Sequence, residues 1–306
     1  MSELAIETTG LKRSFGAFPA LRGIDLRVPA GSVFGLVGPN GAGKTTTFSI
    51  LCGFLHPTEG AAKVLGHDPR DRAALSGKLG ALPQDAPLPT RMSAFDALCY
   101  WGELSGLSRV DAKNDAVRWL DRVGLQEHAR KKGPQLSHGM AKRVALAQAF
   151  LGDPRLVLLD EPTSGLDPKT AHEIKQIIKR EAGTRTVVVS SHDLAQIEEL
   201  CDSVAILDKG SVVQQGTLGD VTGRGELVRL HLADDEADQA TAALSALAFV
   251  THAAFDRAER TLEARVQGAP PEEAVPAILK AALQAGARVV GVTRGQRLEE
   301  RVLELT

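Results

Sequence analysis

The sequence predicts an α/β fold in which helices flank a parallel sheet, followed by a smaller α+β domain. Two short apolar runs, Val33–Val37 and Leu156–Leu159, have the composition of strands that are buried on both faces. Between them, residues 93–123 repeat their apolar side chains at helical spacing. After residue 216 the pattern changes to short alternating strands and helical segments, which indicates the second domain.

The length also favours two domains, because a chain of 306 residues is longer than a typical domain with a single hydrophobic core. We expect a larger domain over residues 1–220, with a helical subdomain at about residues 86–150, and a smaller domain over residues 226–306. Residues 4–8 and 24–29 alternate apolar and polar side chains on either side of turn residues. They predict an antiparallel strand layer ahead of the parallel sheet.

The composition limits the classes of function. A net charge of −2 with 24% charged residues shows no basic excess, so no nucleic-acid partner is expected. Cys52, Cys99 and Cys201 are far apart and odd in number, which indicates neither disulfides nor a metal cluster and fits a reducing cytoplasm. No apolar run reaches the ~18 residues of a membrane span, and Met1–Ala5 lacks the features of a secretion signal. Any membrane role is expected to need another chain.

A glycine-rich phosphate-binding loop follows the first apolar run. Its sequence is Gly38-Pro39-Asn40-Gly41-Ala42-Gly43-Lys44-Thr45, with Thr46 next. The glycines let backbone N–H groups approach concentrated negative charge without obstruction by side chains. A helix that begins near Lys44 adds its positive end, Lys44 reaches the outer phosphates, and the Thr45 hydroxyl is a Mg²⁺ ligand. The loop therefore predicts binding of a nucleoside triphosphate with Mg²⁺.

Asp160 and Glu161 follow the second apolar run. Asp160 falls at the strand end, where doubly wound sheets place their ligands, and it is the expected second Mg²⁺ ligand. Glu161 is then free to deprotonate a water for attack on the γ-phosphate, so it is the candidate general base. Alone, this pair would be interpreted as a solvated strand end. Together with the phosphate loop it predicts ATP hydrolysis.

Three further side chains each have two interpretations. Phe15 lies in an exposed turn, where an aromatic residue either packs or stacks on adenine. Gln84 follows a short apolar run and is either surface or a partner of a metal-bound water. His192 ends the β-branched run Thr186–Ser191 and is either polar surface or a sensor of the γ-phosphate. The functional interpretation of each requires a triphosphate nearby.

A second anion-binding helix start is expected at Ser137. Serine is a favoured helix cap, and Gly139 leaves the first turn open to an anion. The helical pattern itself covers Ala141–Leu151, and Thr163–Pro168 further on predicts a tight turn.

In their order and spacing these motifs resemble the nucleotide-binding subunit of ABC (ATP-binding cassette) transporters, over about residues 3–220. The resemblance implies a phosphate-loop NTPase fold of the ABC type, with a RecA-like core and antiparallel β and helical subdomains. It assigns roles to five single residues: adenine stacking to Phe15, a link between metal and transporter to Gln84, metal ligation to Asp160, general base to Glu161 and a γ-phosphate switch to His192. It also implies two loops, a signature loop at Ser137–Met140 and a cross-dimer loop at Ser164–Asp167.

In that family two subunits pair head to tail, and each ATP lies between the phosphate loop of one and the signature loop of the other. The resemblance therefore implies a second copy of this chain and a separately encoded membrane-spanning permease as partners, at the inner face of the cell membrane. The loop here reads Leu136-Ser137-His138-Gly139-Met140, where the family pattern is Leu-Ser-Gly-Gly-Gln. His138 either adds a pH-dependent donor to the γ-phosphate or points to solvent.

The second domain is expected to follow the order β-α-β-β-α-β, which is the ferredoxin-like arrangement. Strands are predicted at residues 228–232, 249–255, 262–266 and 287–292, and helices at 240–247 and 274–283. The domain is either a packing or dimerising module or a ligand sensor. Its tail, Leu298–Thr306, resembles that of ABC exporter subunits whose permease is a separate chain.

The sequence thus predicts an ATPase subunit that powers an ABC exporter, without indicating its cargo. One alternative is a soluble ABC ATPase that acts on nucleic acid or ribosomes, which would usually carry two cassettes, a coiled coil or a basic stripe. Another is a phosphate-loop kinase or GTPase, for which residues 136–140 would have no use.

Overall fold

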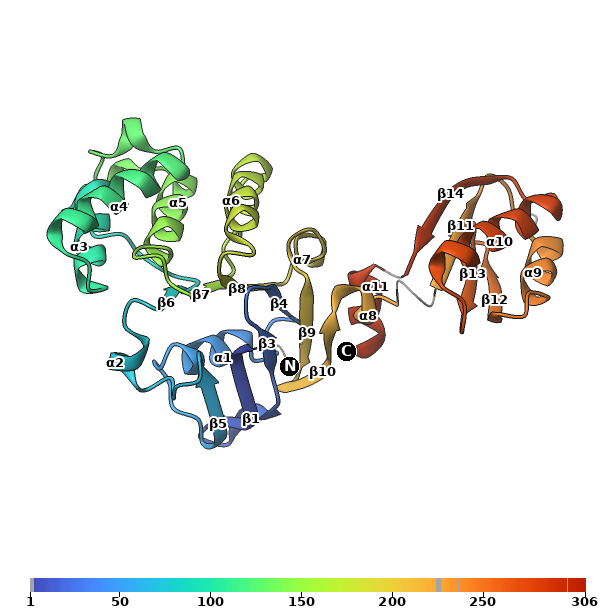
Figure 1. Ribbon diagram of the computed structural model, residues 1–306, viewed down its shortest axis with the longest axis horizontal. Coiled ribbons are helices and arrows are strands. Elements are labelled where there is room, and N and C mark those ends of the chain that lie inside the picture. The colour runs from blue at the N-terminus through green and yellow to red at the C-terminus, as the bar shows by residue number, and fades with distance from the viewer. Residues whose placement is uncertain (1–2, 224–226, 236, 296) are drawn as a thin grey trace. The chain divides into compact units, whose positions relative to one another are not determined.

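The computed structural model describes residues 3–223, 227–235, 237–295 and 297–306. The chain divides into two compact units, Met1–Gln215 and Gly216–Thr306 (Figure 1). The division falls before the expected limit at residue 220, so that α8 (Leu218–Val221) belongs to the second unit. The expected start of the second domain, residue 226, lies outside the described residues.

The first unit is built on a six-stranded sheet with the order β10-β9-β4-β8-β7-β6. The strands are β4 (Val33–Val37), β6 (Leu79–Leu82), β7 (Leu156–Asp160), β8 (Thr186–Ser191), β9 (Ser203–Asp208) and β10 (Ser211–Thr217). Every residue of β4, β7 and β8 is buried, and these strands pair in parallel, which confirms the α/β prediction. Since Val37 pairs with Ser191 and Asp160 with Ser190, the three carboxyl ends lie at one edge of the sheet.

Three helices directly follow strands of this sheet: α1 (Lys44–Leu51) follows β4, α6 (Pro168–Glu181) follows β7 and α7 (Leu194–Leu200) follows β8. The short helix α2 (Arg72–Leu75) precedes β6. Helices α6 and α7 begin at the aspartate caps Asp167 and Asp193, whose side chains accept from backbone N–H groups of the first turn. After β4, β7 and β8 the chain therefore crosses a loop at the sheet edge and enters a helix. Such loops are where α/β proteins place their ligands.

The predicted antiparallel layer is present. It has the order β2-β1-β3, with β5 also paired to β1, and its strands are β1 (Leu4–Phe15), β2 (Phe18–Ile24), β3 (Arg27–Pro29) and β5 (Glu59–Val64). Leu21 of β2 packs on the phosphate loop, because a Cβ built on Gly43 would lie 2.6 Å from its Cδ2 atom. Gly43 also has φ +107°. Packing and backbone conformation therefore both require glycine there.

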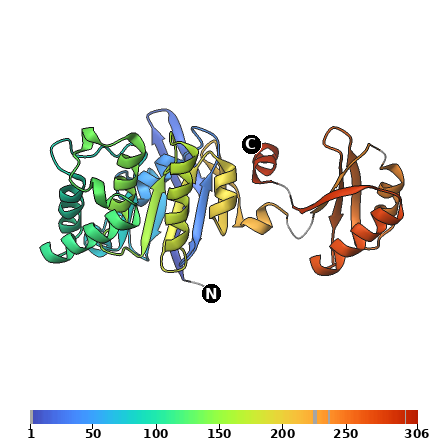
Figure 2. The same cartoon turned by 90° about the horizontal axis from the view of Figure 1, so that it is seen from above.

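A helical region stands beside the β6 edge of the sheet (Figures 1 and 2). It consists of α3 (Ala94–Leu104), α4 (Arg109–Arg122), the short 3₁₀ turns Gln126–His128 and Gly133–Gln135, and α5 (His138–Ala149). Its centre is the fully buried Trp119, which stacks on Phe150 with 4.9 Å between ring centroids. Helix α5 begins at His138, earlier than the predicted Ala141, because the Ser137 hydroxyl accepts from the Met140 N–H and caps it there.

In the second unit the elements follow the predicted order β-α-β-β-α-β. They are β11 (Leu227–Leu232), α9 (Asp238–Ser245), β12 (Val250–Asp256), β13 (Thr261–Val266), α10 (Pro271–Gln284) and β14 (Val289–Arg294), followed by α11 (Leu298–Leu305). The sheet has the order β12-β13-β11-β14 with antiparallel pairing throughout. Side chains of α9 and α10, such as Leu244 and Ile278, share a core with Leu230 and Leu262 of the sheet. Among the described residues, no helix is long and apolar enough to cross a membrane.

Candidate active site

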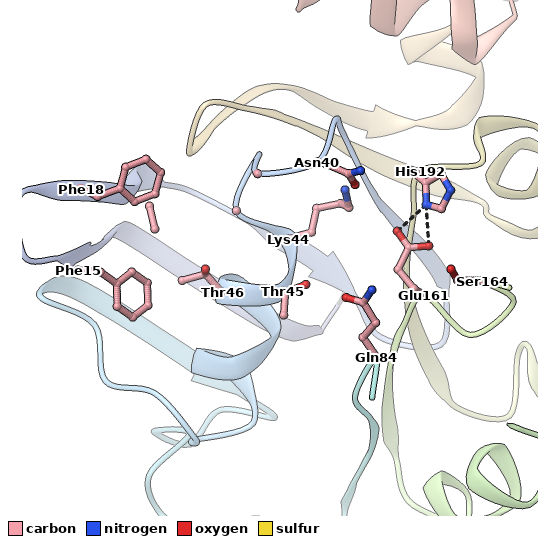
Figure 3. A pocket seen from close by; sticks show the side chains of 13 residues that line it. Phe15, Phe18, Asn40, Lys44, Thr45, Thr46, Gln84, Glu161, Ser164 and His192 are labelled. Atoms are coloured by element: carbon pink, nitrogen blue, oxygen red, sulfur yellow. Dashed lines mark hydrogen bonds and ion pairs between the residues drawn. The ribbon is translucent and has the colours of Figure 1, made fainter. Parts of the chain in front are cut away.

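A cavity of about 460 Å³ opens at the edge where β4, β7 and β8 end (Figure 3). It gathers side chains from the antiparallel layer, the phosphate loop and the ends of β6, β7 and β8. The lining residues are Phe15, Phe18, Ala20, Asn40, Gly41, Gly43, Lys44, Thr45, Thr46, Gln84, Glu161, Ser164 and His192. Most of the residues that the sequence singled out therefore lie around one space.

The remaining candidate residues fall into two groups. Gly38, Pro39 and Ala42 belong to the phosphate loop without lining the cavity, and Asp160 is buried next to Glu161 with 2% of its surface exposed. By contrast, Ser137 and Gly139 lie on a separate loop at the start of α5 and are not among the cavity-lining residues.

Lys44 is directed into the phosphate loop. Its Nζ donates to the carbonyl oxygens of Gly38 at 2.7 Å and Pro39 at 3.2 Å, and its side chain is buried. Burial lowers the pKa of the Lys44 amine, whereas the nearby carboxylates of Glu161 and Asp160 raise it. In the described part of the chain no carboxylate lies within ion-pair distance of this amine. Its charge is thus available to an anion in the cavity.

Glu161 is turned into the cavity by its backbone. It is the first residue after β7 and has φ +48°, a left-handed conformation that is costly for a residue with a side chain. Its N–H donates to the carbonyl and hydroxyl oxygens of Ser190, at 3.2 and 3.0 Å, which holds this conformation. Strain held in this way at a carboxylate fits a functional position.

His192 contacts Glu161 directly. The Nδ1 atom lies 3.0 Å from Oε1 and 2.9 Å from Oε2 of the carboxylate (Figure 3). Glu161 is 6% exposed, whereas the His192 side chain is 58% exposed and faces the cavity. The sequence placed both residues at the γ-phosphate but gave no sign of this pairing. The imidazole can orient the carboxylate for proton transfer.

The sequence predicts that Thr45, Gln84 and Asp160 hold Mg²⁺, and the positions of their side-chain oxygens are compatible with that role. Thr45 and Gln84 are exposed on the cavity wall, and the buried Asp160 carboxylate accepts from the Ser190 hydroxyl through Oδ1, which leaves further lone pairs. Hydroxyl, amide and carboxylate oxygens are the hard ligands that Mg²⁺ prefers, usually with several waters retained. The residues present therefore fit the ion.

Two residues of this region were missed by sequence reasoning. Phe18 lines the cavity next to Phe15, and its signal was a second aromatic just across the Gly16-Ala17 turn. Lys142 of α5 donates through Nζ to the backbone carbonyl of Gln84 at 3.3 Å. Burial lowers the pKa of the Lys142 amine, while the carboxylates of Asp160, Asp85 and Glu161 raise it. A lysine inside a helical pattern carries no sequence signal for such a contact.

The signature loop and the turn after β7 lie side by side. A Cβ built on Gly139 would lie 3.0 Å from Cγ2 of Thr170, and one built on Gly165 would lie 3.5 Å from Nε2 of His138. Asp167 caps α6 by accepting from the Thr170 N–H at 3.0 Å. The starts of α5 and α6 are thus packed together, and His138 is exposed beside Gly165.

Comparison with known proteins agrees with this geometry. The family model described as ABC transporter matches residues 21–164, and one described as an AAA domain matches residues 132–198. The daunorubicin resistance ATP-binding protein DrrA3 of Streptomyces coeruleorubidus is 34% identical over 309 residues, which covers 100% of this chain and 97% of that protein. The chain belongs to the ABC transporter family, as an ATP-binding subunit. The predicted family and ATPase class are confirmed.

Other relatives of this ABC subunit have related names. The linearmycin resistance ATP-binding protein LnrL of Bacillus subtilis is 35% identical over 72% of this chain and 71% of its own length. Nod factor export ATP-binding protein I of Rhizobium sp. is also 35% identical, over 71% of this chain and 72% of its own length. All three relatives are thus described as resistance or export proteins.

Two solved structures resemble the first unit. An ATP-binding subunit of an ABC transporter aligns with a TM-score of 0.66 and 28% identity, covering 72% of this chain and 92% of its own. A dimeric ATP-binding cassette in a post-hydrolysis state, bound to ADP and Pi, aligns with a TM-score of 0.63 and 26% identity, covering 70% of this chain and 98% of its own. The ABC-type fold predicted from the motifs is confirmed.

Proposed function

We propose that this ABC ATPase binds Mg²⁺-ATP as a head-to-tail dimer of identical chains and drives export through a separately encoded permease at the inner face of the cell membrane. In this proposal residues 1–220 form the ATPase domain and residues 226–306 an accessory domain. The names of the resistance and export relatives support the exporter class. They do not identify the cargo of this chain.

One observation carries the dimer proposal. The cavity holds Lys44, Glu161 and His192, whereas Ser137 and Gly139 do not line it, although their helix start is suited to bind an anion. If a second copy supplied its Ser137 loop to this cavity, both anion-binding helix starts would serve one triphosphate. The similar solved cassette is dimeric and bound to ADP and Pi, which supports a dimer as the nucleotide-bound form.

The chemistry follows from the placement of the side chains. Lys44 and the loop N–H groups hold the outer phosphates, and Thr45, Gln84 and Asp160 would hold Mg²⁺, which neutralises phosphate charge when bound. Water adds to the γ-phosphorus, the bond to the leaving oxygen of ADP breaks, and the proton of the water passes to Glu161. His192 keeps that carboxylate oriented. Loss of the γ-phosphate contacts then lets the dimer open, which is the step coupled to transport.

Mixing two inactive variants tests whether sites are shared between chains. Ser137→Arg is expected to bind ATP but not hydrolyse it, and Lys44→Ala is expected to bind it only weakly. A mixed dimer has one site with an intact Lys44 and an intact Ser137, so up to about a quarter of the wild-type sites should recover, since half of random dimers are mixed. ATP hydrolysis by the mixture measures this.

The control is a mixture of Lys44→Ala with a chain that carries both Lys44→Ala and Ser137→Arg. No dimer in this mixture contains an intact Lys44, so the mixture should remain inactive. Absence of recovery in the first mixture would argue that each chain hydrolyses ATP alone. Activity that is linear in protein concentration down to dilutions at which the protein is monomeric would have the same meaning.

The permease is tested separately. Membranes that contain a co-expressed six-span permease encoded next to this chain are expected to retain the subunit, and membranes without it are expected not to. Equal retention by both would contradict the proposed partner. Tight, salt-sensitive binding to DNA or RNA would instead favour the nucleic-acid alternative, which the net charge of −2 does not support.

A further inference from the structure

The hydroxyl group of Ser190 makes two contacts at the edge of the sheet where the cavity opens. Ser190 lies on β8 directly opposite Asp160, the last residue of β7, in the parallel pairing of these strands. Its Oγ atom accepts from the backbone N–H of Glu161 at 3.0 Å, and its hydroxyl donates to Oδ1 of Asp160. One side chain therefore contacts both of the acidic residues that the proposed reaction uses.

The chemistry of the groups fixes the direction of these two hydrogen bonds. A backbone N–H can only donate, so the oxygen of Ser190 accepts from Glu161. An ionised carboxylate can only accept, so the single hydroxyl hydrogen of Ser190 goes to Asp160. The hydrogen bonds thus run in one direction, from the Glu161 N–H through the Ser190 hydroxyl to the Asp160 carboxylate.

Both hydrogen bonds lie inside the protein. Ser190 is 0% exposed and Asp160 is 2% exposed. A buried polar group that loses its partner bears the cost of its own desolvation, and this cost is larger when the group is charged. Loss of the Ser190 hydroxyl would therefore remove a buried partner from each of its two neighbours.

The contact with Glu161 acts on a residue that has a strained backbone. Glu161 has φ +48°, and its N–H is shared between the carbonyl oxygen of Ser190 at 3.2 Å and the hydroxyl oxygen at 3.0 Å. Such a conformation persists only where surrounding contacts hold it. At the other end of the side chain, Nδ1 of His192 lies 2.9 Å from Oε2 (Figure 3). Ser190 therefore holds the backbone of Glu161, and His192 holds its carboxylate.

The contact with Asp160 orients a carboxylate. Because the Ser190 hydroxyl donates to Oδ1, it restricts the rotation of the Asp160 carboxylate and so the direction of its remaining lone pairs. Carboxylates that bind metals are commonly oriented by outer hydrogen bonds of this kind. Loss of such a bond typically lowers metal affinity or activity 10- to 100-fold.

We infer that Ser190 is a positioning residue for ATP hydrolysis, whose one hydroxyl fixes the metal ligand Asp160 and the general base Glu161 relative to each other. The inference rests on the proposed function, which gives these two residues their roles. Ser190 does not line the cavity, so it acts through its neighbours and not on the nucleotide. Its loss should impair hydrolysis and the use of Mg²⁺ more than the binding of phosphate by Lys44.

Two variants of the same shape isolate the hydroxyl. Threonine carries a hydroxyl where valine carries a methyl group, so any packing strain at position 190 affects both alike. Ser190→Val is expected to lower kcat about 10- to 100-fold. Ser190→Thr is expected to hydrolyse ATP at least about 10-fold faster than Ser190→Val, because it keeps the donor.

Thr186→Val is the matched control for the loss of a hydroxyl. Thr186 is also a buried residue of β8, but it lies at the other end of the strand, where its Oγ1 atom accepts from the Gly31 N–H at 2.9 Å. The substitution removes a buried hydroxyl from the same strand without touching Asp160 or Glu161. Its kcat should equal that of the wild type.

Calorimetric titration provides a readout that does not depend on turnover. The full chain is titrated with ATP in EDTA and with ATP in the presence of Mg²⁺. In EDTA, Ser190→Val and Ser190→Thr are expected to bind ATP equally, because the phosphate loop is unchanged. With Mg²⁺, Ser190→Val is expected to bind about 10-fold more weakly than Ser190→Thr, the lower end of the range for an outer contact of a metal ligand.

The outcomes separate this inference from the proposal on which it rests. Equal kcat values for Ser190→Val and Ser190→Thr would overturn the inference and leave the ATPase proposal intact. An equal loss of ATP binding by Ser190→Val with and without Mg²⁺ would overturn it as well, because the serine would then only support the edge of the sheet. A wild-type chain that hydrolyses no ATP would contradict the proposed function itself.

Discussion

Replacement of Glu161 by glutamine is expected to slow ATP hydrolysis by about 10²–10⁴-fold while ATP still binds, because that is the usual contribution of a general base. The amide keeps the size of the side chain and its place next to His192 but cannot accept the proton of the attacking water. Since the γ-phosphate then persists, we also expect the dimer to stay closed. Single-turnover hydrolysis and analytical ultracentrifugation in the presence of Mg²⁺-ATP measure the two effects.

The matched control is Glu59→Gln, which removes an exposed carboxylate that pairs with Lys12 outside the cavity and should hydrolyse ATP at the wild-type rate. If Glu161→Gln turned over ATP normally, the carboxylate would not be the base. The left-handed backbone at Glu161 and its contact with His192 would then need a structural explanation.

Lys44→Ala is expected to cause a large loss of nucleotide affinity. Truncating one partner of a buried, hydrogen-bonded charge pair costs about 2–5 kcal/mol, which corresponds to roughly 30- to 5,000-fold in affinity. Lys44 and a bound phosphate would form such a pair, because the Lys44 side chain is buried and the Gly38 and Pro39 carbonyls orient its amine inside the loop. Calorimetric titration with ATP measures the loss, and circular dichroism checks that the variant is folded.

Lys63→Ala serves as its control, because Lys63 is exposed on β5 and does not line the cavity. Its ATP affinity should match that of the wild type. If a folded Lys44→Ala variant bound ATP as the wild type does, the loop would hold phosphate through its backbone alone. Retained affinity for tripolyphosphate would lead to the same conclusion, and the role given to the amine would be wrong.

The sequence predicted those parts of the site that consist of contiguous residues. The phosphate loop follows a buried strand and begins a helix, and Asp160 ends a strand, because strand composition and turn chemistry are local properties. The cap at Ser137 was also predicted, yet the helix start was placed too late. The cap residue, rather than the first apolar residue, decided where α5 begins.

Contacts between distant segments could not be predicted. Glu161 and His192 meet because β7 and β8 pair in parallel with Asp160 opposite Ser190, and that register depends on the whole sheet. Lys142 reaches the Gln84 carbonyl only because α5 packs beside the end of β6. Phe18 gave a visible signal, but its exposure depends on the packing of the hairpin on the loop.

The structure of Glu161→Gln determined with Mg²⁺-ATP tests the central claim most directly, namely that one nucleotide is held by two chains. We predict two copies related by a twofold axis, with each triphosphate contacted by Lys44 of one copy and by Ser137 of the other. ATP enclosed by a single chain, with residues 136–140 of every copy remote from any nucleotide, would contradict it.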